Sequence, residues 1–323
     1  MTDELAIEAT GLKKSFGDVR VLGGVDLRVA RGTVFALLGP NGAGKTTTVR
    51  ILTTLTRADG GRALVAGHDV DRERHLVRRS ISLAGQYAAV DGLQTGAENL
   101  RMMGRLAGLS RGQARRRAGE LLEQFGLAEA ARRRVANYSG GMRRRLDLAA
   151  SLVGAPSVIF LDEPTTGLDL PSRQVMWQVI ARLAGDGVTV FLTTQYLEEA
   201  DLLAGRIAVL DGGRVVADGT PADLKELVSG QSLDLLLADS AAFDRVAART
   251  AGRALHTDRD GLAISLPTDG TAARVRALLD ELDPERSAIR SFSVHTATLD
   301  DVFLAVTRPG RAAARKEQET THV

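Results

Sequence analysis

The sequence predicts an α/β fold with a mixed sheet, followed by a small C-terminal α+β domain. Several short runs are almost wholly apolar, as strands buried on both faces are. A glycine-rich loop joins one of these runs directly to a helical stretch. After about Pro221 the motifs that carry chemistry stop, although strand and helix patterns continue. The predicted domains are therefore 1–222, with a helical subdomain at about 95–155, and 223–309, and the polar tail 310–323 is expected to be disordered.

The composition is that of an ordinary soluble globular protein, with 25% charged and 44% hydrophobic residues. The 42 basic residues nearly balance the 40 acidic ones, so the net charge gives no sign of nucleic-acid binding. The absence of cysteine excludes disulfides and thiolate metal sites. No stretch is apolar enough for a transmembrane helix, and residues 1–5 do not resemble a secretory signal. Any membrane role is therefore expected to depend on a partner.

A phosphate-binding loop lies near the start of the first domain. It matches the pattern G-x-x-x-x-G-K-[ST] between an apolar strand expected at 33–38 and a helix that continues through 48–52. The loop consists of Gly39, Pro40, Asn41, Gly42, Ala43, Gly44, Lys45, Thr46 and Thr47. Its glycines allow backbone N–H groups to face an anion at the helix N-terminus. We expect Lys45 to reach the β- and γ-phosphates of a nucleotide and the Thr46 hydroxyl to bind Mg²⁺.

The segments around this loop are expected to form strands. Residues 6–29 have the alternation of short strands, and 63–66 and 81–84 are two further short strands. Phe16 is most simply a core aromatic residue. Gln86 directly follows a strand, where ligand contacts are usual in α/β sheets, although a loop glutamine is most often only solvated.

Residues 95–135 have the apolar periodicity of helices. This region and the start of the next helix carry three arginine triplets, at 115–117, 132–134 and 143–145, a pattern that raises the hypothesis of nucleic-acid binding. Exposed helix faces explain the triplets more simply, because acidic residues are interleaved and arginine far outnumbers lysine throughout the chain. No nucleic-acid partner is predicted.

A serine and two glycines open the following helix. Ser139 is a favourable N-cap, and Gly140 and Gly141 permit a ligand to approach the N–H groups at the helix start. Taken alone, this motif predicts only a helix cap.

The apolar strand expected at 157–161 ends in two adjacent carboxylates. Acids at the carboxyl end of a buried strand face the crevice where α/β sheets bind ligands. Asp162 is suited to hold Mg²⁺ through water, and Glu163 to take a proton from attacking water. The pair could instead cap a helix, but the phosphate-binding loop favours the catalytic interpretation.

The remaining segments complete the two domains. A strand expected at 188–194 ends at Gln195, and a hairpin expected at 207–217 closes the first sheet. The second domain has strands expected at 232–237, 262–266 and 291–294 and a helix expected at 272–282. A last amphipathic helix at 299–304 is expected to pack on its own domain through Val302, Phe303 and Leu304.

Together, the phosphate-binding loop, Gln86, the Ser139-Gly140-Gly141 motif, the Asp162-Glu163 pair and Asp169 resemble the nucleotide-binding cassette of ABC transporters. The resemblance covers nearly all of the first 220 residues, although the signature begins with Tyr138 where the family more often has Leu. It implies a P-loop cassette with a mixed sheet core, an antiparallel β subdomain and a helical subdomain.

The resemblance also implies a role for each motif. Phe16 would stack on adenine, and Gln86 would contact Mg²⁺ and the attacking water. Two copies of the chain would sandwich ATP, with the phosphate-binding loop of one facing Ser139 of the other and Asp169 at the interface. ATP would then favour a closed homodimer.

Residue 195 departs from the family pattern, because a His usually follows this strand. Gln195 can hydrogen-bond a γ-phosphate oxygen or the water but cannot carry a proton or a positive charge, so hydrolysis at a reduced rate is expected.

The segments 194–201 and 299–304 further resemble the ATP-binding subunits of daunorubicin resistance. This resemblance implies an ATPase, peripheral on the cytoplasmic membrane face, that serves a separate permease exporting hydrophobic drugs. Two alternatives are a weakly hydrolysing nucleotide switch and a soluble cassette ATPase acting on the ribosome or DNA. The last usually has two cassettes, a long coiled coil or zinc cysteines, which the sequence lacks.

Overall fold

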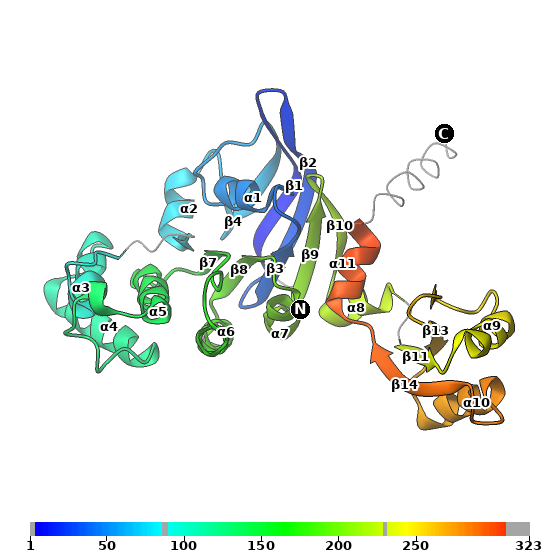
Figure 1. Cartoon of the computed structure of the whole chain (residues 1–323). Helices are drawn as coiled ribbons and strands as arrows, with labels where there is room; N and C mark the ends of the chain where they lie inside the picture. The colour runs from blue at the N-terminus through cyan, green and yellow to red at the C-terminus, as the bar shows by residue number, and fades with distance from the viewer. Residues whose placement is uncertain (1–3, 86–89, 229–230, 308–323) are drawn as a thin grey trace. The chain divides into compact units, whose positions relative to one another are not determined.

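The computed structural model describes residues 4–85, 90–228 and 231–307, and it divides into two compact units at Pro221 (Figure 1). We describe each unit by itself.

The first unit begins with an antiparallel sheet in the strand order β2-β1-β4-β5. Its strands are β1 (Leu5–Phe16), β2 (Val19–Ala30), β4 (Gly60–Val65) and β5 (His68–Asp69). The expectation of several short strands over 6–29 is wrong, because β1 and β2 are 12 residues each and pair along their whole length. Bulges in this pairing absorb the irregular alternation that made the segment look interrupted.

The second sheet of this unit is mixed, as predicted, and has six strands in the order β10-β9-β3-β8-β7-β6. Its strands are β3 (Val34–Leu38), β6 (Ile81–Ala84), β7 (Val158–Asp162), β8 (Thr189–Thr194), β9 (Arg206–Asp211) and β10 (Arg214–Gly219). All neighbours run parallel except the predicted hairpin of β9 and β10. Every residue of β3, β7 and β8 is buried, which explains their nearly unbroken apolar sequences. Because these three strands are parallel, their carboxyl ends lie along one edge of the sheet.

Helices flank this sheet and fill the predicted helical region. Those near the sheet are α1 (Lys45–Leu52), α2 (Arg74–Ser80), α6 (Leu170–Gly185) and α7 (Leu197–Leu203). The helical region contains α3 (Gly96–Leu106), α4 (Arg111–Gln124), a single 3₁₀ turn (Val135–Asn137) and α5 (Gly140–Ser151). Capping boxes start α3 at Thr95 and α4 at Ser110, so each helix begins where a side chain satisfies its free N–H groups.

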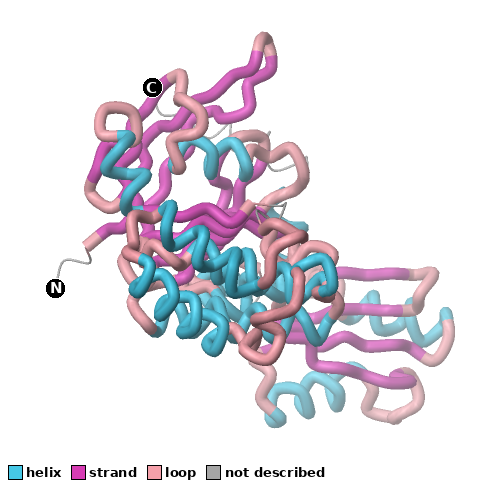
Figure 2. Tube along the Cα trace, turned by 90° about the vertical axis from the view of Figure 1, so that its left-hand side faces the viewer, coloured by secondary structure: helices cyan, strands magenta, loops and turns pink. Residues whose placement is uncertain are grey.

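The second unit is an α+β fold built on an antiparallel sheet in the order β12-β13-β11-β14. Figure 2 shows its four strands side by side at the right. The elements are α8 (Pro221–Glu226), β11 (Gln231–Leu237), α9 (Ser240–Arg249), β12 (His256–Asp258), β13 (Ala263–Thr268), α10 (Ala272–Leu282), β14 (Ile289–Thr296) and α11 (Leu299–Thr307). Helices α9 and α10 cover one sheet face, where Leu233, Phe243 and Leu278 are buried. The predicted strands and the helix at 272–282 are confirmed, whereas the bounds of α8 and α9 were not predicted and the exposed three-residue β12 was missed.

The last helix, α11, extends from Leu299 to Thr307, and the expectation that Leu304 belongs to its buried face is wrong. Val302 is buried, but Leu304 is 53% exposed, so the apolar face does not include Leu304. The predicted tail 310–323 lies outside the described residues.

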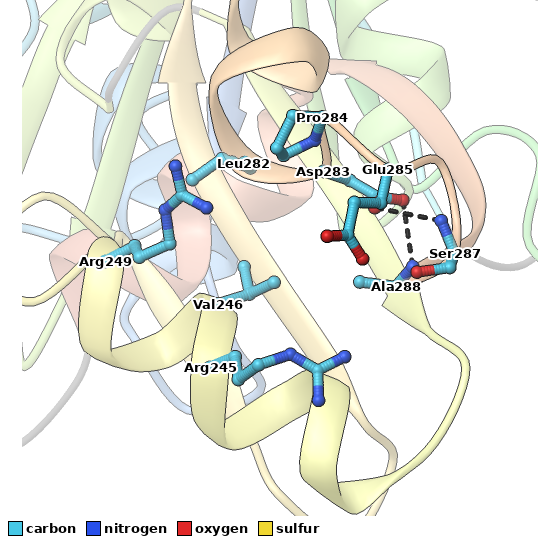
Figure 3. Close-up of a pocket in the computed structure, with 9 residues that line it drawn as sticks. All are labelled: Arg245, Val246, Arg249, Leu282, Asp283, Pro284, Glu285, Ser287 and Ala288. Carbon is cyan, nitrogen blue, oxygen red and sulfur yellow. Dashed lines mark hydrogen bonds between the residues drawn. The ribbon is translucent and has the colours of Figure 1, made fainter.

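An open cavity of about 390 Å³ lies between α9 and the turn after α10 (Figure 3). Its one buried acid, Asp283, accepts hydrogen bonds from the backbone N–H groups of Ser287, Ala288 and Ile289 at 2.9, 3.0 and 2.9 Å. This carboxylate therefore holds the turn together.

Candidate functional site

The loop 39–47 has a backbone that requires its glycines. Gly39, Gly42 and Gly44 have positive φ angles of 156°, 83° and 109°. A Cβ on Gly44 would lie 2.6 Å from the Leu22 side chain, and one on Gly39 would overlap the carbonyl oxygen of Leu210. Glycine is therefore needed at Gly39 and Gly44 both for backbone conformation and for space.

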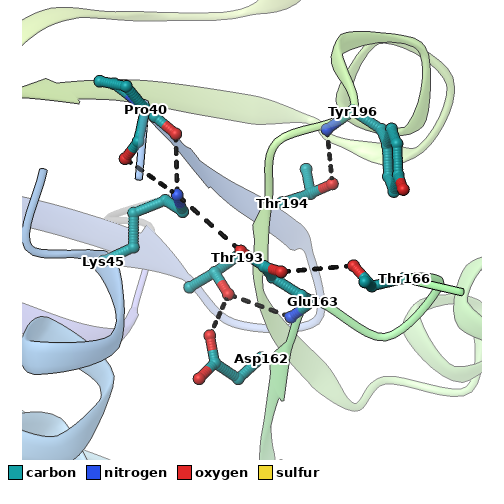
Figure 4. Close-up of polar contacts among 9 residues, drawn as sticks. Pro40, Lys45, Asp162, Glu163, Thr166, Thr193, Thr194 and Tyr196 are labelled. Atoms are coloured by element: carbon teal, nitrogen blue, oxygen red, sulfur yellow. Dashed lines mark hydrogen bonds and ion pairs between the residues drawn. The ribbon is translucent and has the colours of Figure 1, made fainter. Parts of the chain in front are cut away.

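Lys45 lies across this loop with its ammonium group almost buried (Figure 4). Nζ donates hydrogen bonds to the carbonyl oxygens of Gly39 at 2.8 Å and Pro40 at 3.2 Å. It also lies 4.0 Å from Oε1 of Glu163. Burial lowers the pKa of Lys45, while the charges of Glu163 and Asp162 act in the opposite direction. The structure therefore brings the loop lysine and the strand-end acids into one cluster.

The two acids are held by the neighbouring strand β8. Thr193 Oγ1 donates a hydrogen bond to Asp162 Oδ1 at 2.5 Å. The N–H of Glu163 donates to the carbonyl oxygen of Thr193 at 3.0 Å and to its Oγ1 at 3.2 Å. Glu163 has a left-handed φ of 51°, an uncommon conformation for this residue type. The alternative that the pair caps a helix is wrong, because a turn follows and α6 is capped by Asp169.

Three further predicted site residues are exposed. Thr46 is exposed on the first turn of α1, and Gln195 is exposed directly after β8. Phe16 is 53% exposed at the end of β1, with Lys14 Nζ 5.3 Å from the ring centroid. The expectation that Phe16 is a core residue is therefore wrong. Gln86 lies outside the described residues.

The predicted signature residues form a separate group at the start of α5. Ser139 is exposed, and its Oγ accepts a hydrogen bond from the N–H of Met142 at 3.2 Å. A Cβ on Gly141 would lie 2.5 Å from Oγ of Ser172 on α6. The N–H of Ser172 donates to Oδ1 of Asp169 at 3.2 Å, and hydrogen bonds from Ser172 lower the pKa of Asp169. Among the described residues, no hydrogen bond or ion pair joins Ser139 to the loop 39–47.

Tyr138, which departs from the family pattern, has a structural explanation. The side chain is buried, and its hydroxyl donates a hydrogen bond to the carbonyl oxygen of Ala130 at 2.7 Å. Burial raises the pKa of this hydroxyl. The tyrosine thus ties the start of α5 to the segment before it.

Sequence reasoning missed two residues of the site, Thr193 and Arg144. The expectation that the arginine triplets lie on exposed faces is wrong for Arg144, whose side chain is only 11% exposed. Its guanidinium donates to the carbonyl oxygens of Gly85 and Pro164 at 2.6 and 2.8 Å. The spacing carried a signal, because Arg144 precedes buried Leu148 by four residues and so shares its helix face.

Residues 4–85, 90–228 and 231–307 contain no group of three or more His, Cys, Asp or Glu side chains placed to bind a metal ion. Every helix within them is too short or too polar to span a bilayer.

Comparison with known proteins gives consistent matches over most of the chain. The sequence pattern of the family described as "ABC transporter" matches residues 22–166. The daunorubicin/doxorubicin resistance ATP-binding protein DrrA of Streptomyces peucetius is 52% identical over 94% of this chain and 92% of its own length. The Nod factor export ATP-binding protein I of Cupriavidus pinatubonensis is 36% identical over 93% of this chain and 90% of its own.

Solved structures resemble the first unit. An ATP-binding subunit of an ABC transporter, 27% identical, covers 69% of this chain and 92% of its own, with a TM-score of 0.62. An ATP-binding cassette solved as a dimer in a post-hydrolysis state with ADP and Pi is 25% identical, covers 66% of this chain and 98% of its own, and has a TM-score of 0.60.

Proposed function

Because this chain belongs to the ATP-binding subunits of ABC transporters, a family of ATPases, we propose that two copies of it clamp and hydrolyse ATP to drive drug export through a separate permease. The observation that carries this proposal is the cluster in which Lys45 lies between the loop carbonyls and Glu163. Glycines that no side chain can replace surround this lysine, and acids from the adjacent sheet edge face it.

The cluster supports a division of roles in phosphoryl transfer. Backbone N–H groups of the loop and the Lys45 ammonium hold the β- and γ-phosphates, which replace the carbonyl partners that Lys45 has without nucleotide. Glu163 takes a proton from the attacking water. We assign the Gln86 side chain, from the family pattern, to the same water.

The oxygen donors beside the phosphate-binding loop suit magnesium. The Thr46 hydroxyl and the Asp162 carboxylate, acting through water, supply hard oxygen ligands, and Thr193 orients that carboxylate. When bound, Mg²⁺ neutralises charge on the phosphates. Only two protein ligands are needed, because Mg²⁺ usually keeps several waters and takes others from phosphates.

The second half of each nucleotide site comes from the second copy. Ser139 and Gly140 are exposed and Gly141 is half-buried at the start of α5, where the helix dipole favours an anion. We therefore assign them to the γ-phosphate of the ATP held by the other protomer, with Asp169 at the interface. A similar cassette solved as a dimer supports this arrangement.

Replacing Gln195 with histidine is expected to raise the ATPase rate several-fold. Gln195 is exposed directly after β8, the strand whose Thr193 donates a hydrogen bond to Asp162. An imidazole at position 195 adds a group that can carry a proton or a positive charge. Steady-state phosphate release by both proteins measures this. A rate that stays equal or falls would show that the glutamine does not limit hydrolysis.

Replacing Phe16 with alanine is expected to weaken ATP binding by about tenfold, since aromatic stacking on a base contributes roughly 1–3 kcal/mol. The exposed ring has no core to lose, so stability should change little. Titration calorimetry with ATP measures the affinity of the alanine variant. The control is Phe16→Trp, which keeps an aromatic ring. Equal affinity of the alanine and tryptophan variants would remove Phe16 from the site.

The permease and its drug are proposed from relatives. The relatives are named for daunorubicin and doxorubicin resistance, linearmycin resistance and Nod factor export, and we propose that this chain likewise serves export of hydrophobic drugs from the cytoplasmic membrane face. The test is co-purification with the product of the neighbouring reading frame, which should contain about six membrane-spanning stretches. A nucleic-acid enzyme in that position would favour the soluble alternative instead.

A nucleotide switch that barely hydrolyses ATP is the second candidate, favoured only by Gln195. Mg²⁺-dependent turnover indistinguishable from that of a Glu163→Gln variant would select it over the ATPase.

A further inference from the structure

The Arg144 side chain donates hydrogen bonds to the backbone just after strands β6 and β7. It lies on α5, five residues after Ser139. Its Nε donates to the carbonyl oxygen of Pro164 at 2.8 Å, and its Nη1 donates to that of Gly85 at 2.6 Å. Its Nη2 donates to the carbonyl oxygen of Glu163 at 3.4 Å. All three nitrogens of the guanidinium therefore donate hydrogen bonds to backbone carbonyl oxygens.

These carbonyls belong to the exits of two parallel strands. Gly85 follows β6, and Glu163 and Pro164 follow β7. A buried guanidinium is costly, and it is offset here by Asp147 one turn further along α5, whose Oδ2 lies 3.5 Å from Nη1. A planar fork with five donors suits several acceptors at once, which a single ammonium does not.

The Glu163 backbone needs such support. A glutamate with φ of 51° is in a sparsely populated region that costs about 1–3 kcal/mol unless its surroundings hold it. Its N–H is held by Thr193 from β8, at 3.0 and 3.2 Å. Its carbonyl oxygen and that of Pro164, on the other side of the residue, are held by Arg144. Thr193 and Arg144 thus fix Glu163 from opposite sides, and the carboxylate faces Lys45.

We propose that Arg144 is a positioning residue for catalysis: it clamps the backbone of Glu163 in the left-handed conformation that points the carboxylate at the phosphate-binding loop of the same protomer. This proposal rests on the proposed function of Glu163 as the base. Among the described residues, no hydrogen bond or ion pair joins the Arg144 side chain to the loop 39–47 or to Ser139, so its loss is expected to act on the chemical step and to leave ATP binding intact.

The first test separates turnover from binding. Arg144→Gln is expected to lower kcat at least tenfold, with an ATP dissociation constant within about twofold of wild type. Arg144→Lys keeps a positive charge for Asp147 but not the planar guanidinium, so it should recover only part of the rate. If the Arg144→Gln protein does not fold, the kcat of Arg144→Lys alone is the test.

The matched control is Arg117→Gln, which removes a guanidinium that donates to the carbonyl oxygen of Leu152 at the other end of α5, at 3.2 Å. Its kcat should stay near wild type.

The second test asks which protomer's base is affected. In a mixed dimer with Glu163→Gln in one copy, only the other copy retains a base. Adding Arg144→Gln to the copy with intact Glu163 should abolish the remaining turnover, whereas adding it to the Glu163→Gln copy should not. A general distortion of α5 would do the reverse, because Ser139 of one copy serves the nucleotide whose base lies in the other.

The possible results distinguish the role of Arg144 from the proposed ATPase function. Wild-type kcat in Arg144→Gln, a parallel loss of ATP affinity, or loss of turnover in the second mixed dimer overturns the assignment of Arg144 while leaving the ATPase proposal in place. A wild-type protein without Mg²⁺-dependent turnover overturns the proposed function itself.

Discussion

Replacing Lys45 with alanine is expected to weaken ATP binding at least about 100-fold, which corresponds to roughly 2.7 kcal/mol. The side chain is almost buried, so its ammonium meets the phosphates where water screens little. Removing it also leaves Glu163 and Asp162 facing the phosphate charge without the positive charge of the lysine. Titration calorimetry with ATP and Mg²⁺ measures the loss directly.

Lys13→Ala is the matched control for Lys45→Ala. Lys13 is an exposed lysine on β1 in the same unit, and removing it should change ATP affinity less than twofold. An affinity of Lys45→Ala within about threefold of wild type would mean that the loop does not bind phosphate through this lysine.

Replacing Glu163 with glutamine is expected to lower kcat by about 10²–10⁴-fold, the usual contribution of a general base. Glutamine matches the shape of glutamate but cannot take the proton. Affinity for ATP should be equal or higher, because the change removes a negative charge 4.0 Å from Lys45. The measurement is phosphate release at saturating ATP, together with ATP titration of the same preparation.

Glu198→Gln is the control for this change, because Glu198 is an exposed carboxylate on α7. The Glu198→Gln protein should hydrolyse ATP at the wild-type rate. A Glu163→Gln protein that keeps more than about a third of wild-type kcat would assign the base to another group.

Local sequence patterns predicted most of the fold, and the reasons differ by element. Strands β3, β7 and β8 were predictable because both their faces are buried and every residue except Asp162, at the end of β7, is apolar or β-branched. The start of α5 was predictable because Ser139 caps it with its own side chain. The phosphate-binding loop was predictable because only glycine satisfies its backbone.

What the sequence did not reveal depends on contacts between distant segments. Arg144 meets Gly85 and Pro164, which lie 59 and 20 residues away, and no local pattern encodes such a pairing. Thr193 was placed in the right strand, but its bond to Asp162 follows only from the register of β7 and β8. Without the family resemblance, Phe16 was expected in the core because aromatic residues usually are buried, whereas it ends a strand at the surface.

The central claim is that two copies share each ATP, and the most direct measurement is a structure of the Glu163→Gln protein with Mg²⁺ and ATP. We predict a homodimer in which Ser139 of one copy hydrogen-bonds the γ-phosphate held by Lys45 of the other. A structure in which every assembly leaves Ser139 turned away from the terminal phosphate would contradict it.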